Sequence, residues 1–353
     1  MHSPLYSVSL LVLGLLAMGA CGESGSLPED PDRASPAGPS LATAASNSWS
    51  LKAALPTAAF AASAVSVTNG AGQSFVYAFG GRRNGEPDWP IEVYNVATDT
   101  WVARKTFADG SGMNGVVRIG NRLYYSGGWT TSDDRFGNAS NHLFAYDFAD
   151  DRLIQRADLP FHNAEGTSGA IGGKLYVLLG ICSGEAWPAP GYCNGPGGLR
   201  RLYRYDPATN TWAARASAPH YHAGGGGAVL NGKFYVVAGE KPLSGPVSAL
   251  DVYDPATNSW STRAPLPAAG PATATVLKGK LFVVVNGGGT FSYDPGTDKW
   301  THLATPQPAG PGGAYLSSIA TVTIGGSSFV FGIDGHGLDD VTPNLVPSQL
   351  YTP

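Results

Sequence analysis

The stretch Tyr205-Asp206-Pro207-Ala208-Thr209-Asn210-Thr211-Trp212 is repeated almost unchanged at residues 253–260, as Tyr-Asp-Pro-Ala-Thr-Asn-Ser-Trp. In both copies the centre has the composition of a tight turn, because proline presets φ and asparagine tolerates the left-handed region. The aromatic residues at the two ends lie seven positions apart. Each copy therefore predicts a β-hairpin with a Tyr on one strand and a Trp on the other.

The same interval of seven residues occurs five times along the chain. The pairs are Tyr94 and Trp101, Tyr146 and Leu153, Tyr205 and Trp212, Tyr253 and Trp260, and Tyr293 and Trp300. Two half-pairs remain, because Tyr351 has no partner after it and Trp49 has only Ala42 at the Tyr position before it. We expect these halves to complete each other, so that the strand around Trp49 lies beside the strand around Tyr351 and covers a sheet edge.

Two further strands precede each hairpin. The nearer one is apolar and ends in Gly, Asn or Asp; the six copies are residues 76–81, 123–128, 175–180, 234–239, 281–286 and 329–334. These three residue types enter positive φ at the lowest cost, so we expect that conformation at the last residue. A still earlier strand is joined to it by tight turns such as Gly172-Gly173 and Asn231-Gly232. Each unit thus has four antiparallel strands.

Six units of about fifty residues predict an all-β, six-bladed β-propeller whose N-terminal strand closes the last blade. The composition agrees with this fold class. The 353 residues include 48 Gly and 27 Pro, and only 14% are charged, so the chain turns often. Because 43% are hydrophobic, a large core can form, which excludes a wholly disordered chain or a long coiled coil.

The repeats resemble those of the kelch family over about residues 48–353. The resemblance rests on Gly80-Gly81 with Tyr94 and Trp101, Gly127-Gly128 with Tyr146, and Tyr205-Asp206-Pro207 with Trp212. Three places depart from the pattern, namely Leu179-Gly180, Gly239-Glu240 and Leu153. The resemblance implies the propeller fold and leaves the function open. We expect the repeated Tyr and Trp side chains to form the core between blades rather than to contact a ligand.

The N-terminus has the pattern of an export signal. The apolar run Leu10–Ala17 is too short for a membrane-spanning helix. Met18-Gly19-Ala20-Cys21 resembles a bacterial lipobox, which implies acylation of Cys21, although Leu is commoner at the Met18 position and no Lys or Arg precedes the run. The alternative is an ordinary signal peptide. We predict a signal peptide at residues 1–20, a lipidated flexible tether at 21–47, the propeller at 48–353, and a location in the cell envelope, in the periplasm or on the cell surface.

The other two cysteines and the net charge restrict the partners. Cys182 and Cys193 lie eleven positions apart in an exported chain, which favours a disulfide; a metal site is the alternative, but no His lies close by. The net charge of −4 and the absence of any Lys or Arg run argue against nucleic acid. We expect a monomer that meets the membrane only through its lipid and needs no cofactor.

Long loops follow the second strand of most units, whereas the other connections are short. In a propeller these loops share one face, and long loops on a rigid scaffold are the usual place for a binding site. Residues 82, 129 and 240 begin three of them, and aromatic residues such as Trp89 and Trp187 lie within them. The predicted ligand-binding residues are Arg82, Trp89, Asn114, Trp129, Trp187, His222, Glu240, Asp334 and His336.

The connections between units provide the candidate catalytic groups. His162 and His220 stand at the same offset of nine before Ile171 and Val229, so they should occupy equivalent places in neighbouring blades. With Glu165 and Arg82 they form the candidate set for acid, base and anion-binding roles. A metal could in principle use His162, Glu165, His220, His222 and Asp334, but no spacing requires one, so we predict none. His222 has the alternative role of bonding to the backbone.

These observations predict a protein that binds a glycan, a peptide or a protein partner on its long-loop face. The loop aromatics suit sugar rings or apolar partner surfaces, although they could equally pack on their own loops. The alternative is an enzyme that acts on a sugar, similar to the kelch-type sialic acid mutarotases or, less closely, the copper-radical galactose oxidases. The oxidase chemistry requires a cysteine linked to a tyrosine, and all three cysteines here have other expected roles.

Overall fold

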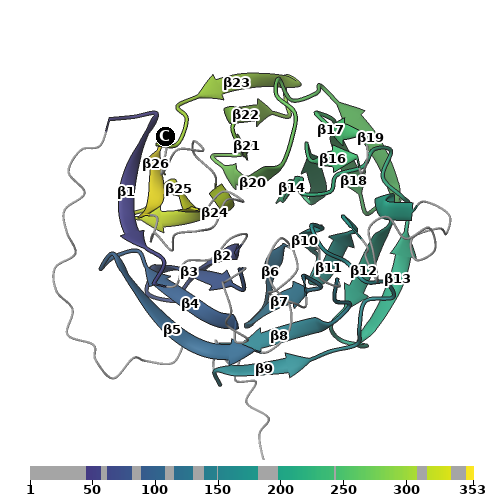
Figure 1. Cartoon of the computed structure of the whole chain (residues 1–353), viewed down its shortest axis with the longest axis horizontal. Helices are drawn as coiled ribbons and strands as arrows, with labels where there is room; N and C mark the ends of the chain where they lie inside the picture. The colour runs from purple at the N-terminus through teal and green to yellow at the C-terminus, as the bar shows by residue number, and fades with distance from the viewer. Residues whose placement is uncertain are drawn as a thin grey trace, which may run out of the picture.

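The computed structural model describes residues 45–56, 62–81, 89–107, 115–129, 139–148, 150–181, 198–241, 244–307, 316–334 and 347–353. Within them the protein is a ring of six antiparallel four-stranded sheets, as Figure 1 shows. The prediction of a six-bladed, all-β propeller is therefore confirmed. The innermost strands contact one another around the ring, in the order β2, β6, β10, β14, β20 and β24 and back to β2.

The strands follow one scheme in every blade, from the centre outward. Blade one has β2 (Ser63–Thr68), β3 (Ser74–Phe79), β4 (Trp89–Asn95) and β5 (Thr100–Phe107). Blade two has β6 (Val116–Ile119), β7 (Arg122–Ser126), β8 (Leu143–Asp147) and β9 (Arg152–Gln155). Blade three has β10 (Thr167–Ile171), β11 (Lys174–Leu178), β12 (Leu202–Asp206) and β13 (Thr211–Arg215).

Blade four has β14 (Gly226–Leu230), β15 (Lys233–Val237), β18 (Leu250–Asp254) and β19 (Ser259–Arg263). Blade five has β20 (Ala272–Leu277), β21 (Lys280–Val285), β22 (Gly289–Asp294) and β23 (Lys299–Leu303). Blade six has β24 (Leu316–Ile324), β25 (Ser327–Asp334), β26 (Pro347–Thr352) and β1 (Ser48–Ala54). Outside the blades lie the small hairpin β16 (Glu240–Lys241) and β17 (Gly245–Pro246) and a single 3-10 turn, η1 (Gly198–Arg200).

The two ends of the described chain join in blade six. The N-terminal strand β1 pairs antiparallel with β26, and Trp49 stands directly opposite Tyr351. Figure 1 shows the purple β1 on the outer side of the yellow β26. The expectation that these two half-pairs complete each other is confirmed. As a result, the outer edge of the last blade is built from the opposite end of the sequence.

Contacts to one residue of the neighbouring blade explain why the Tyr-to-Trp interval is constant. In blade four, Asn258 Oδ1 accepts hydrogen bonds from the Tyr253 hydroxyl (2.8 Å) and from the N–H of Ala216 in blade three (3.1 Å). The indole Nε1 of Trp260 donates to the carbonyl of the same Ala216 at 2.7 Å. Three side chains therefore hold the N–H and the C=O of one residue, and a change in their spacing would release these groups.

The same contacts recur between other blades. Each set consists of an Asn or Asp, a Tyr, a Trp and the alanine that these three side chains hold. The four sets, in that order, are Asp99, Tyr94, Trp101 and Ala53; Asn210, Tyr205, Trp212 and Ala157; Asp298, Tyr293, Trp300 and Ala264; and Asn47, Tyr351, Trp49 and Ala304. In blade two, Leu153 replaces Trp and has no N–H to donate. The Tyr side chains are buried, which confirms their expected place in the core between blades.

The turn chemistry follows the sequence closely, with one correction. Asn231 and Gly232 have φ of 52° and 72°, as a tight hairpin turn requires. The expected positive φ after the second strand is present at Gly81, Gly128 and Gly239, but it is wrong for Gly180 and for Asn286. At residue 180 glycine serves a different purpose, because a Cβ there would lie 2.1 Å from the carbonyl oxygen of Glu165. In blade five the adjacent Gly287 takes the positive φ, 69°.

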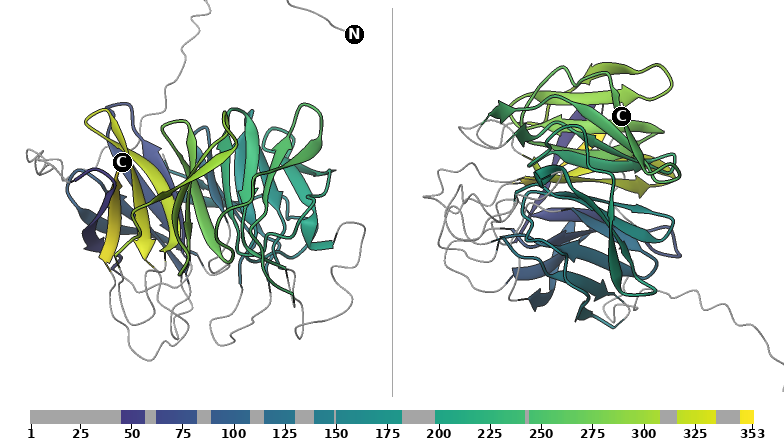
Figure 2. Two further views of the ribbon diagram at one scale, coloured as in Figure 1. Left: turned by 90° about the horizontal axis from the view of Figure 1, so that it is seen from above. Right: turned by 90° about the vertical axis from the view of Figure 1, so that its right-hand side faces the viewer.

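Equivalent strands of the six sheets have the same direction relative to the axis of the ring, as the side views in Figure 2 show. The connections from second to third strand and those from one blade to the next therefore leave one common end of the ring, which we call the loop face. The short hairpin turns occupy the other end, the turn face. Glu240 and the small hairpin β16–β17 lie on the loop face, between β15 and β18.

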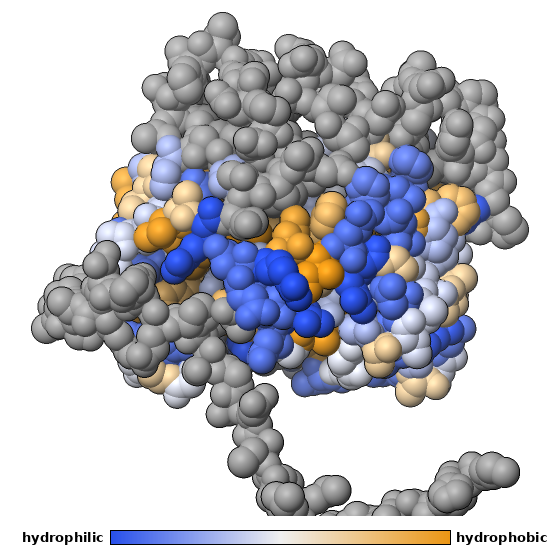
Figure 3. All heavy atoms as spheres, turned by 90° about the horizontal axis from the view of Figure 1, so that it is seen from below, coloured by the Kyte–Doolittle hydropathy of each residue, from blue (hydrophilic) through white to orange (hydrophobic). Residues whose placement is uncertain are grey.

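The side of the ring in Figure 3 shows hydrophilic residues with small hydrophobic patches between them. Leu51 and Val102 are the exposed large hydrophobic residues of the described chain, and they stand on different strands, β1 and β5. Single exposed residues of this kind are normal for a protein surface. Among the described residues, no helix has the length and apolar character needed to cross a membrane.

Candidate functional site

The propeller axis is hollow. A cavity of about 450 Å³ is lined by the inner strands of all six blades together with Asn286. Small residues let these strands approach closely. A Cβ at Gly115 would lie 2.6 Å from the backbone nitrogen of Ser168, and one at Gly227 would lie 2.1 Å from Thr167 Oγ1. The glycines near the start of the inner strands are therefore required for packing, and they leave backbone and hydroxyl groups as the cavity wall.

Two polar atoms of this wall have no partner among the described residues. Ser168 Oγ and Asn286 Oδ1 are buried, and neither has a hydrogen bond to any residue that the structure describes. Both residues line the cavity. A buried polar atom without a partner costs about 1–3 kcal/mol, so the arrangement favours a polar guest on the axis.

Glu165 stands at the loop-face end of this cavity, beside the lining residue Gly166. Its backbone has a φ of 55°, and its carbonyl accepts a hydrogen bond from the N–H of Gly224, another lining residue, at 2.9 Å. Burial, and next the charge of Glu240, raise the pKa of the Glu165 carboxyl to about 7. The predicted residues Glu165 and Glu240 are thus brought within electrostatic reach of each other by blades three and four.

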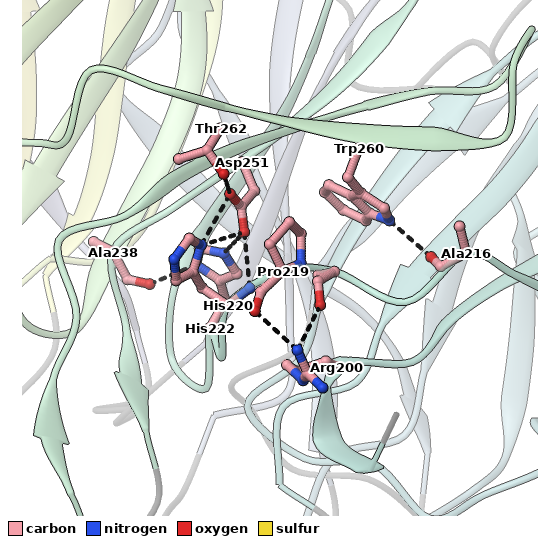
Figure 4. Close-up of polar contacts among 10 residues, drawn as sticks. Arg200, Ala216, Pro219, His220, His222, Ala238, Asp251, Trp260 and Thr262 are labelled. Atoms are coloured by element: carbon pink, nitrogen blue, oxygen red, sulfur yellow. Dashed lines mark hydrogen bonds and ion pairs between the residues drawn. The ribbon is translucent and has the colours of Figure 1, made fainter. Parts of the chain in front are cut away.

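A second cluster surrounds Asp251 on β18, and Figure 4 shows its contacts. The Asp251 carboxylate is fully buried and accepts from the His220 backbone N–H (3.0 Å), His220 Nδ1 (3.0 Å), His222 Nε2 (3.2 Å) and Thr262 Oγ1 (2.8 Å). Burial alone would raise the pKa of Asp251, but the hydrogen bonds from His222 and Thr262 outweigh it and hold the pKa below its usual value. The site is therefore built around a buried negative charge.

The two histidines have different roles in this cluster. His222 is fully buried, and its Nδ1 lies 2.8 Å from the carbonyl oxygen of Ala238, a residue held at a φ of 60°. Both ring nitrogens of His222 thus face oxygen atoms, one of the Asp251 carboxylate and one of the Ala238 carbonyl. The expected backbone bond of His222 is therefore present. His220 keeps 45% of its side chain exposed, and with Nδ1 donating to Asp251 its Nε2 lone pair is available on the loop face.

A group of cations lies next to this cluster. The Arg200 guanidinium and the Lys241 ammonium stand 5.5 Å and 5.8 Å from the centre of the Tyr221 ring. Arg200 also donates to the carbonyl oxygens of Ala218 and Pro219, at 3.3 Å and 2.9 Å. This places three residues from η1, the β13–β14 connection and β16 at one point of the loop face.

The remaining predicted site residues are only partly described. His162 lies in the β9–β10 connection, which corresponds to the β13–β14 connection of His220, but its Nδ1 contacts the carbonyl of Ala139 rather than a carboxylate. Trp129 forms an isolated bridge with Ala139 at the loop face. Trp89 begins β4 and Asp334 ends β25, where only the backbone is described. Outside the described residues lie Cys21, Arg82, Asn114, Cys182, Trp187, Cys193 and His336.

Asp251 is not among the residues predicted from the sequence, although a signal for it exists. The residue two places before the repeated Tyr is aromatic in three blades, as Phe144, Tyr203 and Phe291. A carboxylate at this position, in a strand buried on both faces, requires compensating donors. No group of three His, Cys, Asp or Glu side chains suited to a metal ion occurs within the described ranges.

Comparisons with known proteins agree with the fold. A family model described as the Kelch motif matches residues 222–267, which cover most of blade four. A human protein, "Kelch repeat and BTB domain-containing protein 12", is 29% identical over 100 residues, and this match covers 27% of the chain but only 16% of that protein. A solved structure, "Structure of YjhT", has a TM-score of 0.58 at 16% identity and covers 82% of this chain and 98% of its own. The sequence matches support a kelch-repeat protein, and the structural match shows the fold.

Proposed function

We propose that this kelch-repeat propeller is an exported, lipid-anchored protein that binds a neutral carbohydrate at the loop-face end of its axial cavity. The observation that carries the proposal is the cavity of about 450 Å³ with the unpartnered polar atoms of Ser168 and Asn286 in its wall. Sugar hydroxyls both donate and accept hydrogen bonds, so they can satisfy such groups. Of the three partner classes that the sequence predicted, the cavity favours the glycan, because its volume suits a small polar molecule better than a folded surface.

The entrance of the cavity supports the same ligand class. Carboxylates accept strong hydrogen bonds from hydroxyl groups, and Glu165 and Glu240 provide two at this end. Glu165 and Ala238 both have positive φ although neither is Gly, Asn or Asp. Backbone strain of this kind concentrates at ligand sites. Lipidation of Cys21 would anchor the propeller to a membrane through the tether at residues 21–47. The propeller would then lie in the periplasm or on the cell surface.

The experiment is a binding measurement with neutral oligosaccharides. We expect wild-type protein to bind a subset of a neutral glycan array, and Glu165→Gln or Ser168→Ala to weaken binding of the strongest of these ligands about tenfold each by calorimetry. Ser168→Ala removes a hydroxyl group, and Glu165→Gln replaces an acceptor oxygen of the carboxylate by an amide donor. Asp150→Asn, an exposed carboxylate in the β8–β9 turn on the turn face, is the matched control and should bind as wild type. No binding on the array, or equal affinities for all variants, would refute the proposal.

A second candidate function is general acid–base chemistry on the bound sugar. The specific observation is the pairing of a Glu165 pKa of about 7 with a histidine, His220, that a buried aspartate orients on the same face. A carboxyl with such a pKa can donate a proton near neutral pH, and an oriented imidazole can accept one. Within the described ranges His162 has no equivalent carboxylate partner, so His220 is the stronger base candidate of the two.

Anomer exchange of the bound sugar, followed by NMR, tests this second candidate. We expect the exchange rate to fall as the pH rises through about 7, because the protonated Glu165 is the acid and is lost in that range. Glu165→Gln should reduce the rate at least a hundredfold. An unchanged rate in the double variant His162→Ala/His220→Ala would remove the histidines from the mechanism.

A further inference from the structure

We propose that Arg200, Tyr221 and Lys241 form a separate anion site on the loop face, which binds the carboxylate or sulfate groups of an acidic polysaccharide. The two cations lie 5.5 Å and 5.8 Å from the Tyr221 ring centre, so both are held at one aromatic side chain. That the anionic group belongs to a polysaccharide rests on the proposed carbohydrate function of this face. The anion chemistry itself rests on the contacts below.

The first argument is the absence of a balancing charge. In the described part of the chain Arg200 and Lys241 have no ion pair, whereas Lys174, Lys233 and Lys280 pair with Asp206, Asp254 and Asp294 on the turn face. Other described lysines, such as Lys52 and Lys299, also lack an ion pair to any described residue. What distinguishes Arg200 and Lys241 is that both lie at one aromatic ring, so their charges add at one point. Such a point attracts an anionic group.

The second argument is that the site is held in place before a ligand arrives. The Arg200 guanidinium donates from one nitrogen to the carbonyls of Ala218 and Pro219, which fixes its plane and leaves other N–H groups to bind. Its Nε is buried and lacks an acceptor. Tyr221 lies between His220 and His222, and Asp251 binds both histidines, so the segment that carries Tyr221 is fixed from the inside of the blade. A fixed guanidinium matches the planar oxygens of a carboxylate or sulfate.

The neighbouring charges are compatible with this assignment. The acidic residue beside Lys241 in β16 is Glu240, and its charge acts on Glu165 at the cavity entrance. We therefore expect the anion site and the axial cavity to be neighbours on the loop face, the first binding an anionic group and the second a neutral one.

The test compares acidic and neutral oligosaccharides of equal length on the full-length protein. The probes are an oligogalacturonate, a sulfated dextran oligosaccharide, an uncharged dextran oligosaccharide and a polyglutamate peptide. We expect at least one acidic saccharide to bind about tenfold more tightly than the uncharged one, and its affinity to fall as salt increases. The double variant Arg200→Gln/Lys241→Gln should abolish this preference, whereas Lys233→Gln/Lys280→Gln, which removes two lysines of the turn face, should retain it.

The outcomes separate this proposal from the carbohydrate proposal. Loss of the acidic preference in the double variant, with neutral binding unchanged, supports the anion site. An acidic preference that survives the double variant would overturn it, as would equal binding of polyglutamate and the acidic saccharides. If neutral sugars fail to bind but the acidic preference still depends on Arg200 and Lys241, the anion site stands and the axial carbohydrate site falls. Circular dichroism of each variant confirms that it is folded.

Discussion

Trp49→Ala should lower the free energy of unfolding by about 4 kcal/mol, because replacing a buried Trp by Ala typically costs 3–5 kcal/mol. Trp49 is 6% exposed, and its ring packs against Tyr351 and Phe282 at centroid distances of 5.3 Å and 6.2 Å. Its indole also donates to the carbonyl of Ala304 at 2.8 Å. The effect should be large because β1 closes the ring: this N-terminal strand pairs with the C-terminal strand β26 in the last blade. Urea denaturation measures it directly.

Leu51→Ala provides the control on the same strand. Leu51 is 53% exposed and lies two residues further along β1, so its replacement should change stability by less than about 0.5 kcal/mol. Trp49→Phe keeps an aromatic ring but removes the indole N–H, and it should fall between the two. If Trp49→Ala proved as mild as Leu51→Ala, the closure of the ring by β1 would have little energetic importance.

The parts of the fold that the sequence predicted are those with local causes. The hairpins follow from turn residues such as Pro207 and Asn210. The constant interval between Tyr and Trp follows from one residue of the next blade, whose N–H and C=O are fixed by the Tyr, Asn and Trp contacts. Because the same pattern occurs in six units, its assignment in one unit is supported by the others. The closure by Trp49 was also predictable, because the incomplete pairs at the two ends have only each other as partners.

The parts that the sequence did not predict depend on contacts between distant residues. Gly180 was expected at positive φ, whereas its actual role is to leave room for the carbonyl of Glu165. A glycine looks the same in sequence whichever of these two reasons requires it. Likewise, Arg200 and Lys241 come from different blades, and only the fold places both beside Tyr221. The position of Glu165 at the cavity entrance required the same long-range information.

Asp251→Ala is the prediction with the other large effect, a loss of about 4 kcal/mol in the free energy of unfolding at pH 7. The buried carboxylate accepts hydrogen bonds from His220, His222 and Thr262, and each buried donor left without an acceptor costs about 1–3 kcal/mol. The change leaves the fully buried Nε2 of His222 without its acceptor, while Nδ1 still faces the carbonyl of Ala238. Asp254→Ala, which removes a partly exposed carboxylate on the same strand that pairs with Lys233, is the matched control and should have little effect.

The pH dependence of this loss distinguishes a buried charge from simple packing. Because the hydrogen bonds hold the pKa of Asp251 below that of the unfolded chain, its charge stabilises the native state at neutral pH. That stabilisation is fully present above the unfolded pKa and is lost as the pH falls through the lower native pKa. The difference in stability between wild type and Asp251→Ala should therefore shrink in acid, as measured by urea denaturation at a series of pH values. A difference that stays constant from neutral pH into strong acid would mean that Asp251 contributes through packing alone, and that His220 is not oriented by a charged partner.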